Sequence, residues 1–317
     1  MTELHVASLN IRNLADRWAE RLPLLLADFA AFQPDLLGLQ EVVYPMEQDR
    51  IIGSAGDGRY RLHRAWAGRP EYGNSILVRE PIATADPARL ELGHSRSAGR
   101  IRLELDDVRL TFVNLHLHHE VPDDAIRAEQ VGQVLVWLGQ DSSNEATGSS
   151  AEVVVGDFNA DPAEPAYARM IAAGFRSALL EANGAEPAVT WPSGLQGPAI
   201  DTDGEPSCLD YIWLRGNVRV EAARVVFDRP GANDPGLFPS DHFGLSARLR
   251  LGSGRVALMT GPSPGRSGWP TGAIIGSSPR TAWRGCSRRW RWPAVTGSSS
   301  MSSSRSTVCP SCSTTHR

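Results

Sequence analysis

Short apolar segments that end in polar residues recur through the first 251 residues, and they restrict the chain to a fold built on buried strands. Val153–Val155 leads directly into Gly156-Asp157-Phe158-Asn159. The same arrangement recurs at Leu39-Gln40-Glu41, Asn114-Leu115-His116, Leu209-Asp210-Tyr211 and Ser240-Asp241-His242. In α/β proteins, ligands bind beyond the ends of such strands. We therefore expect these polar side chains to form one shared site.

Helical patterns separate some of these segments. Apolar residues recur at helical spacing from Trp18 to Phe29 and from Asp124 to Leu138. Asp161-Pro162 has the residue types of a helix N-cap and first turn, so a further helix is expected to begin there. A polar surface loop is expected over residues 141–150. The remaining predicted strands are Leu4–Leu9, Leu36–Leu39, Tyr60–Trp66, Ser75–Val78, Ile101–Leu105, Val108–Leu115, Leu209–Leu214, Val218–Phe227 and Phe243–Leu249.

Strands outnumber helices in this pattern, and some strands follow one another directly. Asp106-Asp107 separates two strands as a hairpin turn would, so antiparallel and parallel pairs are expected in one sheet. The length of 317 residues and the hydrophobic content of 41% suit a protein with a sizeable core. The pattern predicts an α/β (α+β) fold with two stacked mixed sheets flanked by helices.

The composition changes after about residue 252, where Arg, Ser, Gly and Pro dominate. Residues 253–317 contain nine Arg and no Asp, Glu or Lys. We expect a catalytic domain over residues 1–252 and a disordered tail over 253–317. An alternative is that the tail binds nucleic acid or an acidic surface. Cys309 and Cys312 have the spacing of a zinc or redox site, but they lack a second pair.

The first residues and the hydropathy pattern bear on localisation. The N-terminus has neither the basic stretch nor the apolar segment of a secretory signal. No run approaches the roughly 18 apolar residues that a membrane span needs. We therefore expect a cytoplasmic protein without a membrane span, acting as a monomer.

Six motifs resemble, in order and spacing, those of the endonuclease/exonuclease/phosphatase superfamily, the DNase I-like metal-dependent phosphoesterases. They are Ser8-Leu9-Asn10, Leu39-Gln40-Glu41, Asn114-Leu115-His116-Leu117, Gly156-Asp157-Phe158-Asn159, Leu209-Asp210-Tyr211 and Ser240-Asp241-His242. The resemblance covers residues 3–250. It implies a DNase I-like four-layer α/β/β/α sandwich and Mg²⁺-dependent hydrolysis of phosphate esters, with Mn²⁺ as an alternative ion.

Three oxygen-bearing side chains are the expected metal ligands. Mg²⁺ prefers hard oxygen ligands and keeps several waters, so a few carboxylate and amide groups suffice to hold it. Glu41 with help from Asn10 would be the anchor, and Asp241 is a candidate second ligand. The resemblance places the metal at these same positions.

The other polar residues suit the remaining steps of ester hydrolysis. Asp157 is expected to orient or deprotonate the attacking water, and Asn159 to donate its amide hydrogens to a phosphate oxygen. His242 would bind the phosphate or relay a proton, with Asp210 fixing its tautomer and orientation. By resemblance, His116 faces the leaving group as a general acid, although it could instead be a paired core histidine.

The segment His116-Leu117-His118-His119-Glu120 superficially suggests the HxHxDH zinc motif of a different two-metal hydrolase. The acid and the final histidine of that motif do not fit. Strand alternation also predicts His116 and His118 on one face, with His119 on the other. Three histidines so placed would not converge on one ion.

The charge of the predicted domain bears on its substrate. The basic residues of the chain are all Arg, and without the nine in the tail 23 Arg face 36 acidic residues, which gives −13. Proteins that grip nucleic acid usually present a basic face. A small phosphate ester is therefore favoured over a polymer, with Arg12, Arg96 and Arg100 as candidate contacts to one phosphate. The alternatives are a DNA or RNA nuclease on the same site and a catalytically silent binding protein.

Overall fold

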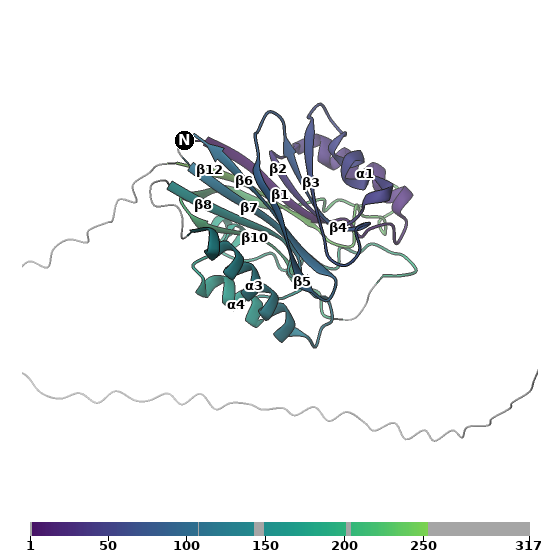
Figure 1. Ribbon diagram of the computed structural model, residues 1–317. Coiled ribbons are helices and arrows are strands. Elements are labelled where there is room, and N and C mark those ends of the chain that lie inside the picture. Colours follow the sequence, from purple (N-terminus) through teal and green to yellow (C-terminus); the bar gives the residue numbers. More distant parts are fainter. Residues whose placement is uncertain (1, 107, 143–148, 201–203, 253–317) are drawn as a thin grey trace, which may run out of the picture. The chain divides into compact units, whose positions relative to one another are not determined.

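A computed structural model describes residues 2–106, 108–142, 149–200 and 204–252, which form two six-stranded sheets flanked by helices (Figure 1). Sheet A has the strand order β11-β12-β1-β2-β4-β3, and sheet B the order β5-β6-β7-β8-β10-β9. The predicted tail, with its Cys309 and Cys312, lies outside the described residues.

Sheet A is mixed. Its strands are β1 (Thr2–Asn10), β2 (Leu36–Val43), β3 (Tyr60–Trp66), β4 (Tyr72–Arg79), β11 (Val218–Val226) and β12 (Gly244–Leu251). The pair β1 and β2 is parallel, and the other neighbours are antiparallel.

Sheet B is mixed as well, as expected. Its strands are β5 (Ala85–Gly93), β6 (Arg96–Leu105), β7 (Val108–His116), β8 (Ser149–Asp157), β9 (Arg176–Ser177) and β10 (Asp210–Gly216). Only β7 and β8 pair in parallel among its described strands. Leu105 pairs with Val108, which confirms the predicted two-residue hairpin.

Helices cover the outer face of each sheet, except for the short helix that adds Ala178 and Leu179 to the core between the sheets. The helices are α1 (Trp18–Phe32), α2 (Gln48–Gly53), α3 (Asp124–Ser142), α4 (Pro165–Ala172) and α5 (Ala178–Asn183), with a 3₁₀ turn at Tyr44–Met46. Helix α1 packs on sheet A through Leu25 and Phe29. Helices α3 and α4 pack on sheet B through Val131 and Met170 (Figure 1).

Strand β8 shows why an unbroken apolar run predicts a buried strand. Val153 and Val155 belong to the core between the two sheets, whereas Val154 belongs to the core beneath α3 and α4. Because both faces of the strand are buried, both sets of alternating positions are apolar. With a core between the sheets and another outside each of them, the predicted four-layer α/β/β/α sandwich is confirmed.

Two local predictions were wrong. Helix α4 begins at Pro165, preceded by Glu164, and not at Pro162. The Asp161 carboxylate instead accepts a hydrogen bond from the Ala163 N–H at 2.6 Å, which closes a turn that competes with helix formation. The polar loop predicted over 141–150 is also too long, since α3 continues to Ser142 and β8 begins at Ser149.

Several elements were not predicted, among them β9 and the 3₁₀ turn. Strand β5 contains Pro87, is largely exposed and lies at the edge of sheet B, where a proline costs no ladder hydrogen bond. Helices α2 and α5 have six residues each, too short for a periodic pattern.

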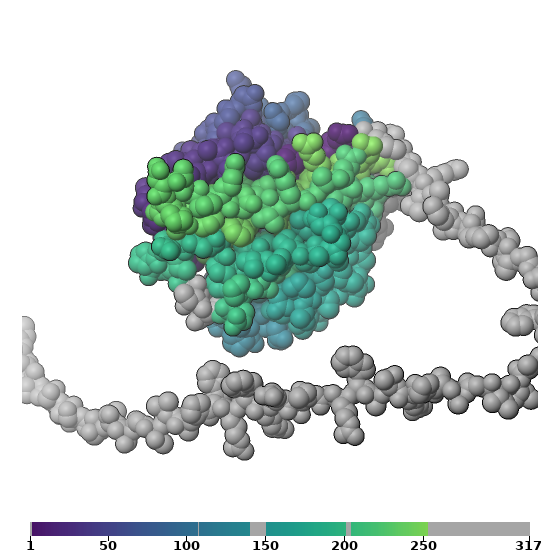
Figure 2. All heavy atoms as spheres, turned by 180° about the vertical axis from the view of Figure 1, so that it is seen from behind, coloured from purple at the N-terminus to yellow at the C-terminus, as the bar shows by residue number. Residues whose placement is uncertain are grey.

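The two ends of the described chain meet in sheet A, because β12 lies between β1 and β11. From behind, the green C-terminal part forms a band between the purple N-terminal part and the teal middle part (Figure 2). Among the described helices, none has the length and apolar character needed to cross a bilayer.

Candidate active site

Three neighbouring strands of sheet B bring His116, Asp157 and Asp210 into one row. His116 at the end of β7 pairs with Asp157 at the end of β8, and Asp157 pairs with Asp210 at the start of β10. Side chains at paired positions point to the same face of a sheet. All three side chains are buried, with Asp157 and Asp210 at 1% exposure. The strand register therefore builds this row directly, as the recurring strand endings predicted.

Gly156 allows β8 to carry Asp157 this close to β7. Its φ is 144°, in the region that side chains rarely adopt, and a Cβ there would lie 2.0 Å from the carbonyl oxygen of Leu115. A residue with a side chain would therefore push the two strands apart. The glycine that precedes Asp157 is a geometric requirement of the row.

Sheet A packs against sheet B below this row, and the buried amide side chains of Gln40 and Asn114 connect the two sheets. Gln40 Nε2 donates to Asn114 Oδ1 at 2.6 Å, and Asn114 Nδ2 donates to the Leu39 carbonyl at 2.9 Å. Gln40 also pairs in register with Asn10 at the end of β1. Asn114 therefore joins the two sheets below the site and is not itself one of its functional residues.

Glu41 leaves the strand alternation at this point. Its φ is 60°, and the register of β2 against β4 shifts between Leu39 and Val42. Gln40 is fully buried, while Glu41 lines a cavity. The irregularity thus places two consecutive polar residues in different environments.

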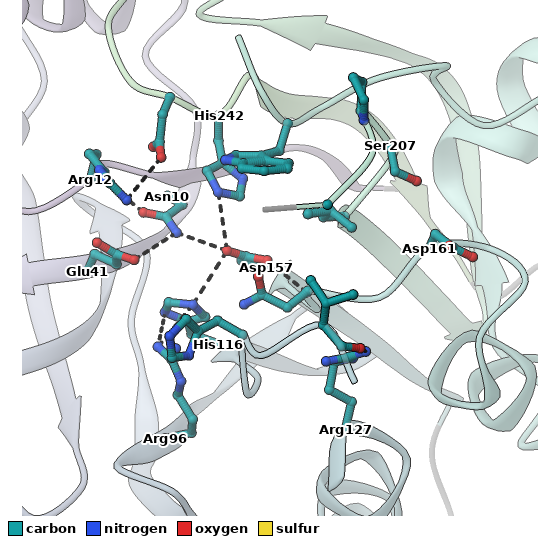
Figure 3. A pocket seen from close by; sticks show the side chains of 18 of the residues that line it. Asn10, Arg12, Glu41, Arg96, His116, Arg127, Asp157, Asp161, Ser207 and His242 are labelled. Atoms are coloured by element: carbon teal, nitrogen blue, oxygen red, sulfur yellow. Dashed lines mark hydrogen bonds and ion pairs between the residues drawn. The ribbon is translucent and has the colours of Figure 1, made fainter. Parts of the chain in front are cut away.

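A cavity of about 910 Å³ lies over these strand ends (Figure 3). Seven of the eight predicted site residues line it: Asn10, Glu41, His116, Asp157, Asn159, Asp241 and His242. The eighth, Asp210, supports His242 through a hydrogen bond of 2.9 Å. The structure therefore gathers the eight residues into one site.

The Asp157 carboxylate lies at the centre of the site. Its Oδ2 accepts from Asn10 Nδ2 at 2.9 Å and lies 3.5 Å from His116 Nε2 and 3.6 Å from His242 Nε2. Its Oδ1 accepts the backbone N–H of Asn159 at 2.9 Å. Burial raises the pKa of Asp157 to about 6, although His242 lowers it. The group is then mainly ionised at pH 7 but basic enough to accept a proton.

His242 and Asp210 form a buried pair. The Nδ1–H of His242 donates to Asp210 Oδ2 at 2.9 Å, which leaves Nε2 directed toward Asp157. Burial lowers the pKa of His242, but the charges of Asp210 and then Asp157 outweigh this effect and raise the pKa to about 10. His242 is therefore an imidazolium at neutral pH, oriented by Asp210 as predicted.

His116, unlike His242, is a neutral histidine. Burial lowers its pKa well below the usual 6.5, and Arg96, His242 and His119 lower it further. Arg96 Nη1 lies 3.1 Å from both ring nitrogens of His116. The ring is consequently neutral at pH 7.

Strand β7 ends at His116, and the predicted alternation of the following histidines was wrong. Leu117 donates its N–H to the Asp157 carbonyl at 2.9 Å. His119 joins His116 in lining the cavity, whereas His118 is buried and bonds Asp123 at 2.8 Å. The three histidines do not converge on one point. This agrees with the expectation that they do not form the zinc motif.

Asn159 also has a left-handed backbone, with φ 48°. Its Nδ2 donates to the Leu117 carbonyl at 3.1 Å, which anchors the side chain beside Asp157. An amide nitrogen has two hydrogens. One is therefore engaged in the protein, and the other remains for a ligand.

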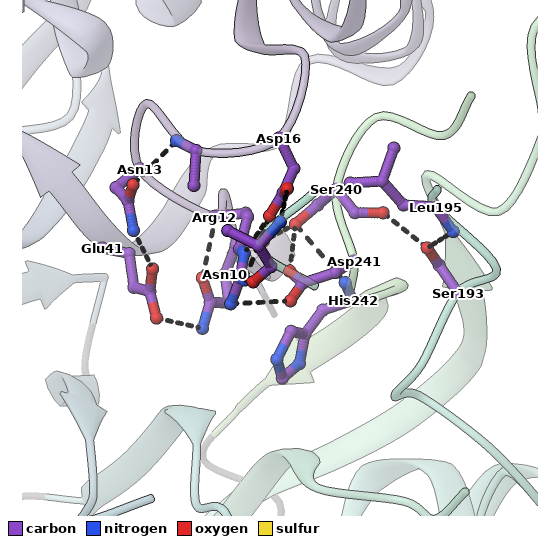
Figure 4. Close-up of polar contacts among 12 residues, drawn as sticks. Asn10, Arg12, Asn13, Asp16, Glu41, Ser193, Leu195, Ser240, Asp241 and His242 are labelled. Carbon is purple, nitrogen blue, oxygen red and sulfur yellow. Dashed lines mark hydrogen bonds and ion pairs between the residues drawn. The ribbon is translucent and has the colours of Figure 1, made fainter. Parts of the chain in front are cut away.

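Asn10, Glu41 and Asp241 form the sheet A side of the cavity (Figure 4). Glu41 accepts from Asn10 Nδ2 at 3.4 Å and from Asn13 Nδ2 at 2.6 Å. Asp241 lies 3.3 Å from Arg12 Nη1, and the neighbouring Ser240 hydroxyl donates to the Asn10 carbonyl at 2.6 Å. Two carboxylates and an amide oxygen make a donor set that fits Mg²⁺.

A second group, partly behind the cavity wall, could offer three metal-ligand atoms. One atom each from Asp157, Asp210 and His242 lie within 4.8 Å of one another, as do atoms of His118, Glu120 and Asp123 outside the row. His242, however, is already an imidazolium bonded to Asp210, so an ion there would have to displace a proton. The donor chemistry therefore favours Asn10, Glu41 and Asp241 for a hard cation.

The cavity also includes residues that the strand-end pattern did not single out. Tyr72 is the first residue of β4, and Trp191 lies in an irregular segment, so neither position had a sequence signal. Of the three arginines proposed as phosphate contacts, Arg12 and Arg96 line the cavity. Arg100 does not, because its guanidinium packs over Trp137 on the helix side of sheet B, 4.6 Å from the ring centre.

A four-layer sandwich with a row of buried acid and histidine residues across its strand ends defines a DNase I-like hydrolase. The model of the Endonuclease/Exonuclease/phosphatase family matches residues 7–242. This chain belongs to the endonuclease/exonuclease/phosphatase family.

Known proteins similar to this chain agree with that assignment. Nocturnin from Xenopus laevis is 27% identical over 258 residues, which cover 72% of this chain and 64% of that protein. The chain thus matches less than two thirds of that relative's length.

Solved structures support the fold. The catalytic domain of human nocturnin with bound sulfate superimposes with a TM-score of 0.61 and 22% identity, over 79% of this chain and 95% of that one. TDP2 from D. rerio, complexed with a single-strand DNA product, gives 0.64 and 18% over 79% and 100%. Truncated TDP2 from Caenorhabditis elegans gives 0.62 and 18% over 78% and 97%.

Proposed function

We propose that this protein hydrolyses phosphate esters in a Mg²⁺-dependent reaction in which water attacks phosphorus. The observation that supports this most strongly is the Asp157 carboxylate. It has a pKa of about 6, and Asn10, His116 and His242 surround it at a cavity of about 910 Å³. A base of this pKa is matched to proton transfer near neutral pH.

Asn10, Glu41 and Asp241 are the proposed ligands of the ion. When bound, Mg²⁺ supplies positive charge that stabilises the charge developing on the phosphate oxygens. Mn²⁺ accepts the same oxygen donors and is the proposed alternative. The neighbouring Arg12 already compensates Asp241 in the protein alone, at 3.3 Å.

Asp157 and the groups around it would handle the water and the phosphate. Asp157 accepts the proton of the attacking water, while the Asn10 amide at 2.9 Å holds its carboxylate in place. The His242 imidazolium binds a phosphate oxygen through Nε2–H, since its other nitrogen is held by Asp210. The free amide hydrogen of Asn159 adds a second, uncharged donor.

His116 would assist the leaving group. Its ring is neutral in the protein alone because burial and Arg96 lower its pKa. A bound phosphate is negative and raises the pKa of a nearby histidine. Substrate binding would thereby prepare His116 to donate a proton, and Arg96 would hold the ring in place.

A small ester is the proposed substrate class. The acidic balance over residues 1–252, with 23 Arg against 36 acids, disfavours a polyanion. Asp161 lines the side of the cavity away from Glu41, where a second phosphate would meet negative charge (Figure 3). Nuclease activity is the second candidate, because the structure of D. rerio TDP2 contains a single-strand DNA product and Arg12 and Arg96 line the cavity here.

A substrate panel on the full chain tests this proposal. We expect hydrolysis of bis-p-nitrophenyl phosphate or p-nitrophenyl phosphate with Mg²⁺ or Mn²⁺, and loss of activity with EDTA or with Asp157→Asn. Faster turnover of single-stranded DNA than of any small ester would favour the nuclease. A folded, metal-binding protein that hydrolyses no phosphate ester would instead be a silent binding protein.

A further inference from the structure

Arg21 lies in the first turns of α1, and its side chain is fully buried at 0% exposure. A guanidinium has five N–H donors in a rigid fork. Here each of the five hydrogen bonds goes to a backbone carbonyl: those of Ile11 at 3.0 Å, Arg12 at 3.2 Å, Ala15 at 2.8 Å, Asp16 at 2.7 Å and Pro239 at 2.9 Å. The side chain is therefore satisfied entirely by main chain outside its own helix.

The five carbonyls belong to two segments that are far apart in the sequence. Residues 11–16 connect β1 to α1 and directly follow Asn10. Pro239 precedes Asp241 by two residues. One side chain thus joins the segment after one proposed metal ligand to the segment before another. The same two segments meet a second time, where the Ser240 hydroxyl donates to the Asn10 carbonyl at 2.6 Å.

The segment after Asn10 needs such support. Arg12, Asn13, Asp16 and Arg17 have φ values of 56°, 37°, 45° and 66°. A left-handed conformation costs a residue with a side chain roughly 1–2 kcal/mol. Four of them in six positions persist only when surrounding contacts over-determine the conformation. The carbonyls held by Arg21 include those of Arg12 and Asp16, two of these four residues.

Packing alone does not account for an arginine at this position. A buried charge is costly, and apolar residues of similar volume often replace buried ions without loss of stability. None of the hydrogen-bond acceptors of Arg21 in the described chain is a carboxylate. What an apolar side chain could not provide is five directed hydrogen bonds to two segments.

We propose that Arg21 is a positioning residue, which sets the placement of Asn10 relative to Asp241 by holding the backbone of residues 11–16 and of Pro239. This inference rests on the proposed function, since Asn10 and Asp241 are its proposed metal ligands. Arg21 touches neither the ion nor the substrate and acts through the main chain.

The variants Arg21→Met and Arg21→Lys in the full chain separate positioning from charge. Mn²⁺ binding is measured by titration calorimetry without substrate, at a temperature where circular dichroism shows the folded state. If Arg21 positions the ligands, both variants bind Mn²⁺ at least tenfold more weakly, because Lys retains the charge but cannot form the five-bond fork. If only its charge matters, Arg21→Met binds the cation more tightly and Arg21→Lys binds like the wild type, which would overturn the proposal.

Arg215→Met is the matched control for lost stability. Arg215 lies on β10, five residues or roughly 16 Å along the strand from Asp210. Its side chain bonds Glu152 and the Ala173 carbonyl. It should lower the melting temperature and leave Mn²⁺ affinity unchanged. Equal Mn²⁺ affinity in the wild type and both Arg21 variants would show that Arg21 only stabilises the fold.

Hydrogen exchange keeps this test independent of the proposed function. We expect amides of residues 11–16 and 240–242 to exchange faster in both Arg21 variants, while those of β8 and β10 do not. Unchanged exchange would refute the positioning role, even if the affinity falls. A wild type that binds no Mn²⁺ and hydrolyses no ester would refute the proposed function instead. The exchange rates would still test whether Arg21 holds the two segments together.

Discussion

Sheet A and sheet B contribute to the cavity in different ways. In sheet B, His116, Asp157 and Asp210 occupy paired positions on neighbouring strands, so the ladder itself sets their spacing. In sheet A, Asn10 ends a strand, but Glu41 has a left-handed backbone and Asp241 lies before β12 begins. The first group is placed by register and the second by irregular segments.

This difference suggests a division of labour. A row fixed by the strand ladder suits groups that must meet reacting atoms at set distances. Mg²⁺ demands near-ideal octahedral geometry, so ligands on irregular segments must be held in place, as Arg21 and Ser240 hold the segments of Asn10 and Asp241. Changes in sheet B should therefore affect the chemical step, and changes in sheet A should affect metal affinity.

The largest expected effect is that of Asp157→Asn in the sheet B row. The amide keeps the shape of the carboxylate but cannot accept the proton, so we expect kcat to fall by about 10²–10⁴-fold. Steady-state kinetics at saturating Mg²⁺ measures it. Glu104→Gln, at an exposed acid of the far hairpin, is the control. Recovery of the Asp157→Asn enzyme at high Mg²⁺ would contradict the division between the sheets.

Gly156→Ala should break the row through its backbone. The new Cβ would meet the Leu115 carbonyl and also strain a positive φ, so we expect a loss of roughly 2–4 kcal/mol in the free energy of unfolding. Urea denaturation followed by circular dichroism measures it. Gly93→Ala has a φ of 75° but nothing within 4 Å, so it should cost only about 1 kcal/mol. Equal losses would show that contact with Leu115 is unimportant.

Glu41→Gln tests the sheet A side. The side chain keeps its shape and loses its charge, so we expect metal affinity to fall by about tenfold, equivalent to about 1.4 kcal/mol. Activity should return as Mg²⁺ is raised, with kcat near that of the wild type. A kcat that stays low at saturating Mg²⁺ would place Glu41 in the chemical step and blur the contrast with Asp157.

A further expected effect is a pH dependence of stability in the metal-free protein. The folded state raises the pKa of His242 from 6.5 to about 10 through Asp210 and Asp157, against the effect of burial. Its contribution to stability is therefore complete below pH 6.5 and is lost as the pH rises to about 10. Asp210→Asn should lower the melting temperature more at pH 6 than at pH 10. An equal shift at both values would argue against a charged pair.

The sequence predicted the polar residues on both sides of the site, but it predicted the backbone that places them only in the sheet B row. Buried strands such as Val153–Val155 are apolar on both faces, so their ends can be found without knowing the topology. The two-residue hairpin and the four layers follow from similar local patterns. Asp157, Asp210 and His116 could thus be assigned to one place from strand endings alone.

Irregular backbone limited the rest. The register of β2 against β4 shifts next to Glu41, and β7 ends at His116 before the run of histidines. The turn that Asp161 closes delays the start of α4 to Pro165. Arg21 had no motif at all, since its partners are main-chain atoms of any residue type. Side-chain patterns do not record such contacts.

The position of β12 has a consequence for how the protein is made. Because β12 separates β1 from β11, the first strand to be synthesised lacks one neighbour until the last described strand has left the ribosome. A nascent chain ending before Gly244 would expose an unpaired edge of β1, a site for mispairing or chaperone binding. A separately supplied β12 strand would pair with both β1 and β11 and would thereby complete sheet A.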